Sequence, residues 1–110
     1  MGITKTEHYT LQQNELAHLA RVLGHPARLA IVQYLLKVDS CVGVQIVDEI
    51  PLAQPTISRH LKELKAAGII QGTIEGTSVN YCINGPRWRE VQALFNTLFD
   101  TYVPDLDCDY

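Results

Sequence analysis

Two groups of side chains in this sequence are of types that bind ligands or react. The first group lies in the segment 54–68, QPTISRHLKELKAAG, which is rich in hydroxyl and cationic side chains. Such side chains contact the phosphates and base edges of nucleic acids. The candidates there are Gln54, Thr56, Ser58, Arg59, His60 and Lys62. The second group is the three cysteines, Cys41, Cys82 and Cys108, whose thiolates bind soft metal ions and react with oxidants.

The segment 54–68 is predicted to form an amphipathic helix. Apolar residues recur along it at i, i+4 and i+7 and define one face. The members of this stripe are Ile57, Leu61 and Leu64. Pro55 suits the first turn of a helix, with Gln54 at the cap, and Gly68 suits the position just beyond the helix end. The hydroxyls and cations lie off the stripe, so the helix has a core face and a face able to bind nucleic acid. From this segment alone, an ordinary solvated surface helix is the alternative.

Patterns on either side of this segment predict the elements that position it. Periodic apolar residues indicate two helices before it, a short third helix leading into it, and a long helix near the C-terminal end. The first three helices span Leu11–Leu23, a segment that starts at His25-Pro26 and continues over Ala27–Lys37, and Val44–Ile50. The last runs from Gly85-Pro86 to Pro104. Two strands, Ile69–Glu75 and Ser78–Asn84, are predicted to form a hairpin around Gly76-Thr77. The segment Asp39–Gly43 breaks the helical pattern and is read as a turn or a brief strand.

The order of these elements predicts a winged helix-turn-helix, mainly α with a small β hairpin and with extra helices at both ends. A chain of 110 residues is expected to form one domain, 1–110, with flexible ends at 1–9 and 104–110. The first and last helices carry more apolar surface than so small a domain needs. We therefore expect Leu11–Leu23 and Trp88–Tyr102 to form a two-fold dimer interface. The alternative is that both helices cover the core of a single chain.

Composition and charge argue against several classes of protein. A net charge of −3 disfavours a protein that coats nucleic acid without specificity, although it allows a local basic patch. We see no apolar run long enough to span a membrane and no secretory leader, so we expect a cytoplasmic protein with no membrane partner. Paired catalytic carboxylates, nucleophile–base spacings and glycine-rich phosphate loops are not found, which argues against an enzyme. A dimeric interaction module that has lost DNA binding is a further alternative.

Several segments resemble the ArsR/SmtB repressors. LGHPARLAIVQYLL is similar to that family's L-x-x-P-x-R-x-x-I-L-x-x-L segment, and AQPTISRHLKELKAAGII is similar to its recognition-helix signature. DSCVG occupies the place of the family's cysteine-bearing inducer motif, and GTIEGTSVNYCIN occupies the place of its wing. The resemblance covers Leu16 to Asn84. It implies a homodimeric repressor that binds double-stranded operator DNA without a cofactor and releases it when an inducer binds.

The resemblance places the polar face of the 54–68 helix on DNA. The residues expected there are Gln54, Thr56, Ser58, Arg59, His60 and Lys62. Early residues of the helix are expected at base edges, whereas Arg59 and Lys62 are expected at guanine or phosphate. For His60, DNA contact and core packing are both open. The wing departs from the usual pattern, because it offers Glu75 where wings often carry Arg or Lys, which weakens the expectation of a minor-groove contact.

The cysteines form the candidate inducer site. In winged folds the short strand before the helix-turn-helix pairs with the last wing strand, which would bring Cys41 near Cys82. Cys108, on the tail after the last helix, is placed to reach them from either protomer. Three thiolates without a histidine suit a soft thiophilic ion, and the resemblance makes arsenite the leading inducer. The family's C-V-C motif has Gly43 at its second cysteine position, so a complete site needs Cys82 or Cys108.

Other readings of the thiols stay open. Cys41 could have one partner only, or the cysteines could form no site and act as small apolar residues. A third alternative is a disulfide or persulfide bridge between Cys41 and Cys108 that senses oxidants or reactive sulfur. The carboxylates beside Cys108, at Asp105, Asp107 and Asp109, are expected to be solvated rather than to bind a hard cation. The last helix has no histidine, so the zinc site that some family members carry there is not expected.

Overall fold

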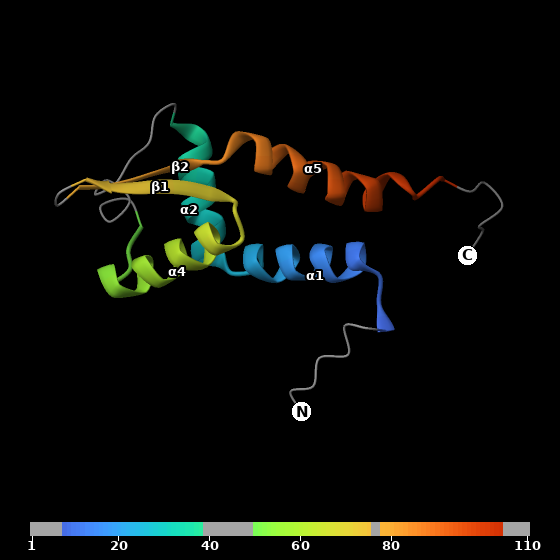
Figure 1. The fold of residues 1–110 in the computed structure, drawn as a ribbon, viewed down its shortest axis with the longest axis horizontal. Helices are drawn as coiled ribbons and strands as arrows, with labels where there is room; N and C mark the ends of the chain where they lie inside the picture. Colours follow the sequence, from blue (N-terminus) through green and yellow to red (C-terminus); the bar gives the residue numbers. More distant parts are fainter. Residues whose placement is uncertain (1–7, 39–49, 76–77, 105–110) are drawn as a thin grey trace.

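The computed structural model describes residues 8–38, 50–75 and 78–104 (Figure 1). The described elements are α1 (Leu11–Leu23), α2 (Pro26–Lys37), α4 (Gln54–Ala66), β1 (Ile70–Glu75), β2 (Ser78–Ile83) and α5 (Gly85–Asp100). This part of the chain is mainly helical with one two-stranded antiparallel hairpin, which confirms the predicted fold class. The predicted turn or strand at 39–43 and nearly all of the predicted helix at 44–50 lie outside the described residues. The same holds for most of the ends predicted to be flexible.

Local sequence explains where the first two helices begin. At α1, Thr10 Oγ1 accepts a hydrogen bond from the Gln13 backbone N–H at 3.0 Å, and Gln13 Oε1 accepts one from the Thr10 N–H at 2.9 Å. This reciprocal capping box satisfies two N–H groups that a helix start otherwise leaves unpaired. At α2, the Nδ1 atom of His25 accepts from the Ala27 N–H at 3.0 Å, and Pro26 occupies the first turn. Both helices accordingly begin and end within a residue of the predicted positions.

The last helix is shorter than predicted. It ends at Asp100 with Thr101 as its C-cap, whereas the sequence pattern extended it to Pro104. Thr101 Oγ1 bonds back to the Leu98 carbonyl at 2.6 Å, which satisfies a terminal carbonyl before the proline is reached. The predicted stripe therefore loses Tyr102, which follows the helix.

One apolar core joins the helices to the hairpin. Its fully buried side chains come from α1, α2 and α4 and from the residues where the hairpin starts: Leu19, Ile31, Val32, Ile57, Leu64, Ile69 and Ile70. Val91 of α5 adds to it at 3% exposure. Ile50, predicted to face inward, is also buried. Burying one such side chain contributes roughly 1.5–3 kcal/mol, so this core fixes how the helices are oriented.

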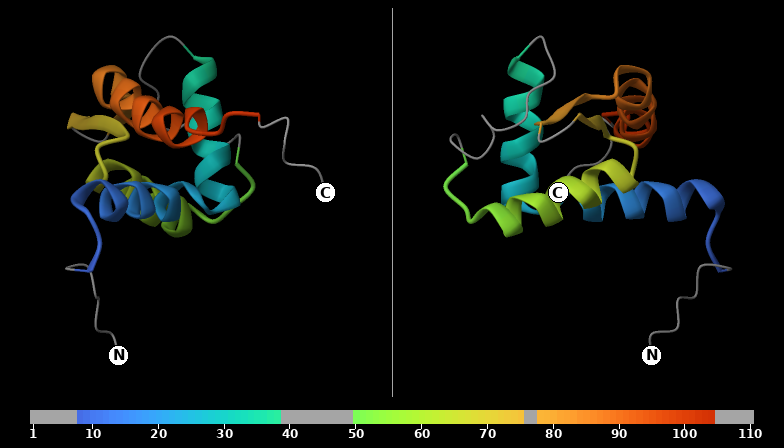
Figure 2. Two further views of the ribbon diagram at one scale, coloured as in Figure 1. Left: turned by 90° about the vertical axis from the view of Figure 1, so that its right-hand side faces the viewer. Right: turned by 60° about the vertical axis from the view of Figure 1, so that its left-hand side comes forward.

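The elements form two layers joined by α2. Helices α1 and α4 lie in one layer, the hairpin and α5 lie in the other, and α2 runs between them (Figure 2). The N-terminal end of α1 and the C-terminal end of α5 extend to one end of the molecule (Figure 1). The N-terminal end of α4 and the far end of the hairpin lie at the opposite end. The fold therefore separates the segment expected on DNA from the segments expected in a dimer.

Candidate nucleic-acid interface

Helix α4 divides its side chains between the core and solvent as the spacing predicted. Ile57, Leu61 and Leu64 expose 1%, 8% and 0% of their surfaces. The opposite face carries the predicted DNA-contacting residues, of which Gln54, Ser58, Arg59 and Lys62 are exposed and Thr56 is half-buried. Within the described part of the chain, the ion pairs do not involve Arg59 or Lys62. Two positive charges on this face are therefore available to an external anion.

The N-terminal end of α4 differs from the prediction in one detail. The N-cap is Ala53 rather than Gln54, which is the first helical residue, and no side chain caps the helix. Pro55 lies in the first turn, where its missing N–H costs nothing. An uncapped helix start in solvent presents the positive end of the helix dipole, which favours a phosphate nearby. The same end carries the residues expected at base edges.

His60 faces inward from α4. It is 7% exposed, and its Nδ1 accepts a hydrogen bond from Arg28 Nε at 3.1 Å. Its ring lies 4.4 Å from that of His25, centroid to centroid. Burial lowers the pKa of His60 below its ordinary value, and the neighbouring charges of His25, Arg28 and Arg59 lower it further. Nδ1 can accept from Arg28 when it carries no proton, so a neutral ring fits this site. The placement favours the packing alternative for His60 over DNA contact.

Lys65, in the last turn of α4, reaches the hairpin. Its Nζ donates to the Gly72 carbonyl of β1 at 3.3 Å. Gly72 leaves no room for a side chain, because a Cβ there would lie 2.3 Å from Tyr81 Cδ1. These contacts hold the hairpin against α4. The structure does not describe the side chains of residues 73–79. The weakened expectation of a minor-groove contact, which rests on Glu75 in the wing, therefore remains a prediction.

Of the three predicted thiol ligands, the structure describes Cys82 alone. Cys82 is half-buried on β2, opposite Gln71 of β1, whose Nε2 lies 3.9 Å from its Sγ. Cys82 is disulfide-bonded. Cys41 and Cys108 fall outside the described part of the chain. Among the described residues, no group of three His, Cys, Asp or Glu side chains is placed to hold a metal ion. The three-cysteine site therefore remains a prediction.

The ends of α1 and α5 expose large apolar side chains. We call these residues the apolar end: Leu11, Leu98, Phe99, Tyr102 and Val103, which expose between 52% and 89% of their surfaces. Between α1 and α5 here lies an apolar pocket of about 210 Å³ that includes Leu16, Leu94 and Leu98. The earlier part of α5 packs on the core instead. Exposed apolar clusters of this kind mark interaction surfaces.

Sequence reasoning missed Arg87, on the first turn of α5. Its guanidinium forms ion pairs with Glu15 at 2.9 Å and with Glu90 at 3.1 Å. The Glu90 pair has i, i+3 spacing, which is a readable local signal on a helix. The Glu15 pair joins residues 72 positions apart, and nothing in the local sequence indicates it.

Comparisons with known proteins agree with this arrangement. A sequence profile described as "Bacterial regulatory protein, arsR family" matches residues 25–71, which include α2 and α4. An uncharacterized HTH-type transcriptional regulator of Methanocaldococcus jannaschii, MJ1325, is 39% identical over 82 residues. That alignment covers 74% of this chain and 92% of the relative.

Solved structures share the fold. The crystal structure of the transcriptional repressor BigR from Xylella fastidiosa has a TM-score of 0.63 and 25% identity to this chain. The match covers 94% of this chain and 100% of the BigR chain. The homodimeric winged helix-turn-helix DNA-binding domain Mb0332 from Mycobacterium bovis has a TM-score of 0.63 and 24% identity. That match covers 90% of this chain and 89% of the Mb0332 chain. These similarities confirm the prediction of a winged helix-turn-helix.

Proposed function

Because this chain belongs to the ArsR family of transcriptional regulators, which are not enzymes, we propose that it is a homodimeric repressor released from its operator by a thiophilic inducer. Its partner is double-stranded DNA, and it acts in the cytoplasm without a cofactor for DNA binding. Arsenite is the leading inducer. The residues that we assign to the operator are Gln54, Thr56, Ser58, Arg59 and Lys62, with His60 supporting the helix from inside.

One observation carries the DNA-binding part of this proposal. Helix α4 buries its whole apolar stripe within the chain and leaves an exposed face with Arg59, Lys62 and an uncapped N-terminus. In a chain of net charge −3, DNA has to be held by such a local basic face rather than by general attraction. A recognition helix enters the major groove with its N-terminal residues at the base edges, which matches the order of side chains here.

The apolar end supports a dimer. Leu98 and Phe99 are 52% and 63% exposed on the last turns of α5, and Leu11 is 89% exposed on the first turn of α1. Two copies related by a two-fold axis would cover these side chains with each other, because an isologous interface pairs the same patch on both subunits. A dimer also supplies two recognition helices for the two half-sites of an operator.

The thiol part of the proposal rests on the donor set. Once the disulfide of Cys82 is reduced, the chain offers three thiols, at 41, 82 and 108, and arsenite binds three sulfurs in a pyramid. Cys82 stands two residues before the Asn84 cap of α5, so a ligand at its sulfur would act on the base of that helix. Soft thiolates favour such an inducer over hard cations.

A second candidate function is favoured by the disulfide at Cys82, a cysteine that the bridge predicted from the sequence, between Cys41 and Cys108, did not include. In this version the trigger is an oxidant or a reactive sulfur species. Two thiols lose two electrons and two protons to the oxidant, and an S–S bond forms between them. Reduction by a cellular thiol would restore DNA binding.

The experiment compares four proteins on one DNA. Reduced wild type, Cys41→Ser, Cys82→Ser and Cys108→Ser are mixed with a fluorescent duplex from the promoter of this chain's own gene. Arsenite and a persulfide donor are then titrated separately, and fluorescence anisotropy follows DNA release. We expect arsenite to release wild type and to require higher concentrations for each variant.

The outcomes separate the candidates. Release of Cys108→Ser by arsenite at the wild-type concentration would contradict the three-cysteine site. Release of wild type by the persulfide donor and not by arsenite would favour the second candidate. Lack of DNA binding by the reduced wild-type protein would contradict both.

A further inference from the structure

Arg87 makes contacts with three helices through one side chain. Its Nη2 pairs with Glu15 of α1 at 2.9 Å, and its Nη1 pairs with Glu90 of α5 at 3.1 Å. Its Nε donates to the backbone carbonyl of Ala67, the C-cap of α4, at 3.3 Å. The fork of a guanidinium can bridge partners in this way, whereas an ammonium group acts as a single point charge. The hydrogen bond to Glu15 is the main cause of the raised pKa of Arg87.

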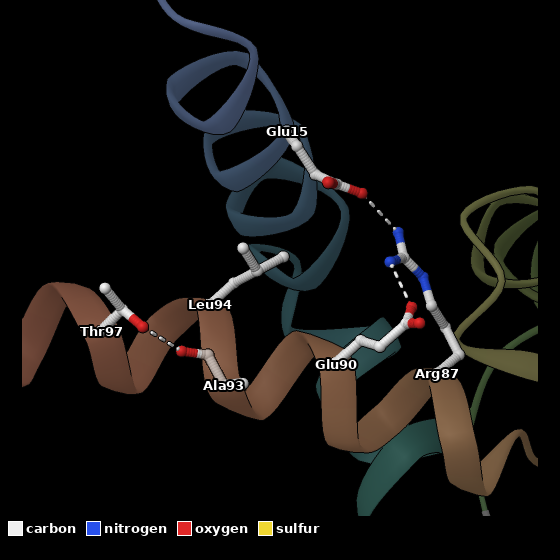
Figure 3. A pocket seen from close by; sticks show the side chains of 6 residues that line it. All are labelled: Glu15, Arg87, Glu90, Ala93, Leu94 and Thr97. Carbon is white, nitrogen blue, oxygen red and sulfur yellow. Dashed lines mark hydrogen bonds and ion pairs between the residues drawn. The ribbon is translucent and has the colours of Figure 1, made fainter.

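The contacts of Arg87 form one end of a groove between α1 and α5 (Figure 3). The groove has a volume of about 420 Å³, with Glu15, Arg87 and Glu90 at its polar end and Leu94 and Thr97 farther along. The Arg87 side chain is 22% exposed, against 45% for Glu15 and 66% for Glu90. The pair with Glu15 is therefore the more shielded of the two and holds α1 to α5.

The end of α4 is shaped to receive Arg87. Gly68 has a φ of +81°, and a Cβ at that position would lie 3.3 Å from Arg87 Cγ. The aliphatic part of Arg87 thus packs on the glycine while its Nε reaches the carbonyl of Ala67. A cation at a helix C-terminus also interacts favourably with the helix dipole. Nearby, the Asn84 N–H donates to the Ile69 carbonyl at 3.0 Å, which ties the start of α5 to the segment after α4.

We propose that Arg87 is the positioning residue that sets the orientation of the recognition helix relative to α1 and α5. The inference rests on the proposed binding of DNA by α4. Arg87 holds the C-terminal end of α4, while the residues assigned to base edges lie at its N-terminal end, about 18 Å away at 1.5 Å per residue. A small rotation at the held end therefore displaces the reading end by a larger distance. Arg87 itself does not lie on the DNA-contacting face in this assignment.

Four variants test the proposal. Arg87→Met removes all three donors, Arg87→Lys keeps the charge without the fork, and Glu15→Gln weakens the pair to α1. Glu90→Gln removes the more exposed partner. On the promoter duplex we expect Arg87→Met to bind about tenfold more weakly, within the range for residues that touch neither ligand. Arg87→Lys should recover a minor part of the loss, Glu15→Gln should bind about threefold more weakly, and Glu90→Gln should stay within about twofold of wild type.

A matched control separates positioning from stability. Val91→Ala is expected to create a small cavity under the same helix, where Val91 is 3% exposed, and to lower thermal stability while Arg87 and its three hydrogen-bond partners stay unchanged in sequence. At a temperature well below unfolding, Val91→Ala should bind DNA as wild type does, and Arg87→Met should not. The dependence of binding on salt gives a second readout. A positioning residue leaves its slope unchanged, whereas each lost phosphate contact reduces it by about one.

Each result has a defined reading. Wild-type affinity in Arg87→Met, or a reduced salt slope in that variant, would overturn the positioning role. Equal losses in Val91→Ala and Arg87→Met would also overturn it. If Arg87→Met does not fold, Glu15→Gln carries the test, and unchanged affinity in that variant overturns the proposal. If wild type does not bind the promoter duplex at all, the proposed function itself fails.

Discussion

Helices α4 and α5 have similar sequence patterns but differ in how much of their apolar surface the chain buries. Each has a proline in its first turn and an apolar stripe, and they contain 13 and 16 residues. In α4 the apolar residues are buried in the chain's own core, with Leu64 at 0% exposure, and the polar face is open. In α5 the stripe runs past the core, so that Leu98 and Phe99 are 52% and 63% exposed.

The difference indicates what each helix is available to bind. A helix whose apolar stripe is buried offers its polar face to a polar partner, and we propose that for α4 this partner is DNA. A helix whose apolar stripe is exposed can be covered by another apolar surface, and we propose that for α5 this surface belongs to a second copy of the chain. The two surfaces lie at opposite ends of the molecule, so both can be occupied together (Figure 1).

The largest expected effect comes from removing the two cations of α4. The double variant Arg59→Ala, Lys62→Ala removes four cations per dimer. At about 1 kcal/mol for each, operator affinity should fall about a thousandfold. The measurement is fluorescence anisotropy on the promoter duplex, with dimer mass checked by sedimentation. Lys37→Ala, Arg89→Ala makes the same charge change outside the assigned face and should lose little affinity. Equal losses of DNA affinity in the two double variants would mean that Arg59 and Lys62 act only through the overall charge of the protein and not through contacts made by α4.

The same residue type behaves differently in the two helices. Leu64→Ala should lower the free energy of unfolding by about 3 kcal/mol, because it empties a fully buried site. Leu98→Ala should cost less than about 1 kcal/mol at a protein concentration where the chain is monomeric, because Leu98 is half-exposed there. Urea denaturation of both variants checks this. Similar losses in the two would mean that Leu98 is already packed within one chain.

Charges placed on the exposed stripe of α5 should separate the dimer. Leu98→Asp, Phe99→Asp puts two carboxylates where apolar surface would be buried, and we expect the dimer dissociation constant to rise about a hundredfold. Sedimentation equilibrium measures it. Leu29→Asp is the matched control, because Leu29 is 45% exposed on α2 and lies outside the apolar end. If the Leu98→Asp, Phe99→Asp variant remains a dimer, the interface does not lie at the apolar end.

The smallest effect concerns the one polar side chain that α4 buries. The pKa of His60 is lowered in the fold from 6.5, so the native state favours the neutral ring. Its contribution to stability is present above pH 6.5 and is lost as the pH falls through the lowered value. In His60→Asn, an amide oxygen can accept from Arg28 without titrating. Between about pH 7.5 and 5.5, the melting temperature of wild type should fall a few degrees further than that of this variant.

The exposed His18 of α1 provides the control for that measurement. His18→Asn should keep the wild-type pH dependence. If His60→Asn also keeps it, the hydrogen bond from Arg28 does not depend on the charge of His60.

Much of the fold could be predicted because it depends on local spacing. The i, i+4, i+7 pattern of Ile57, Leu61 and Leu64 set both the helix and its exposed face. His60 follows Ile57 by three residues and precedes Leu64 by four, so the helical spacing places it on the apolar stripe. Its polar side chain, in contrast, favoured the face expected to contact DNA. What resolved it is the Nε of Arg28, a donor 32 residues earlier in the chain, which no local pattern contains.

Contacts between distant segments account for the rest. The pairing of Arg87 with Glu15 and with the Ala67 carbonyl depends on how α1, α4 and α5 are packed, and none of these residues is unusual in its own segment. The end of α5 was misplaced for a related reason. Apolar residues continue past Asp100 and keep the helical period, but Thr101 caps the helix before the pattern stops.

The most direct test of the central claim is a gel shift with reduced wild-type protein and its own promoter duplex. Arsenite, antimonite, cadmium, zinc and a persulfide donor are added in separate titrations. A thiol-inducible repressor predicts a shifted band without inducer that is lost as arsenite rises, and that zinc leaves in place. No shift at any protein concentration, or a shift that survives every thiol-reactive compound, would contradict it.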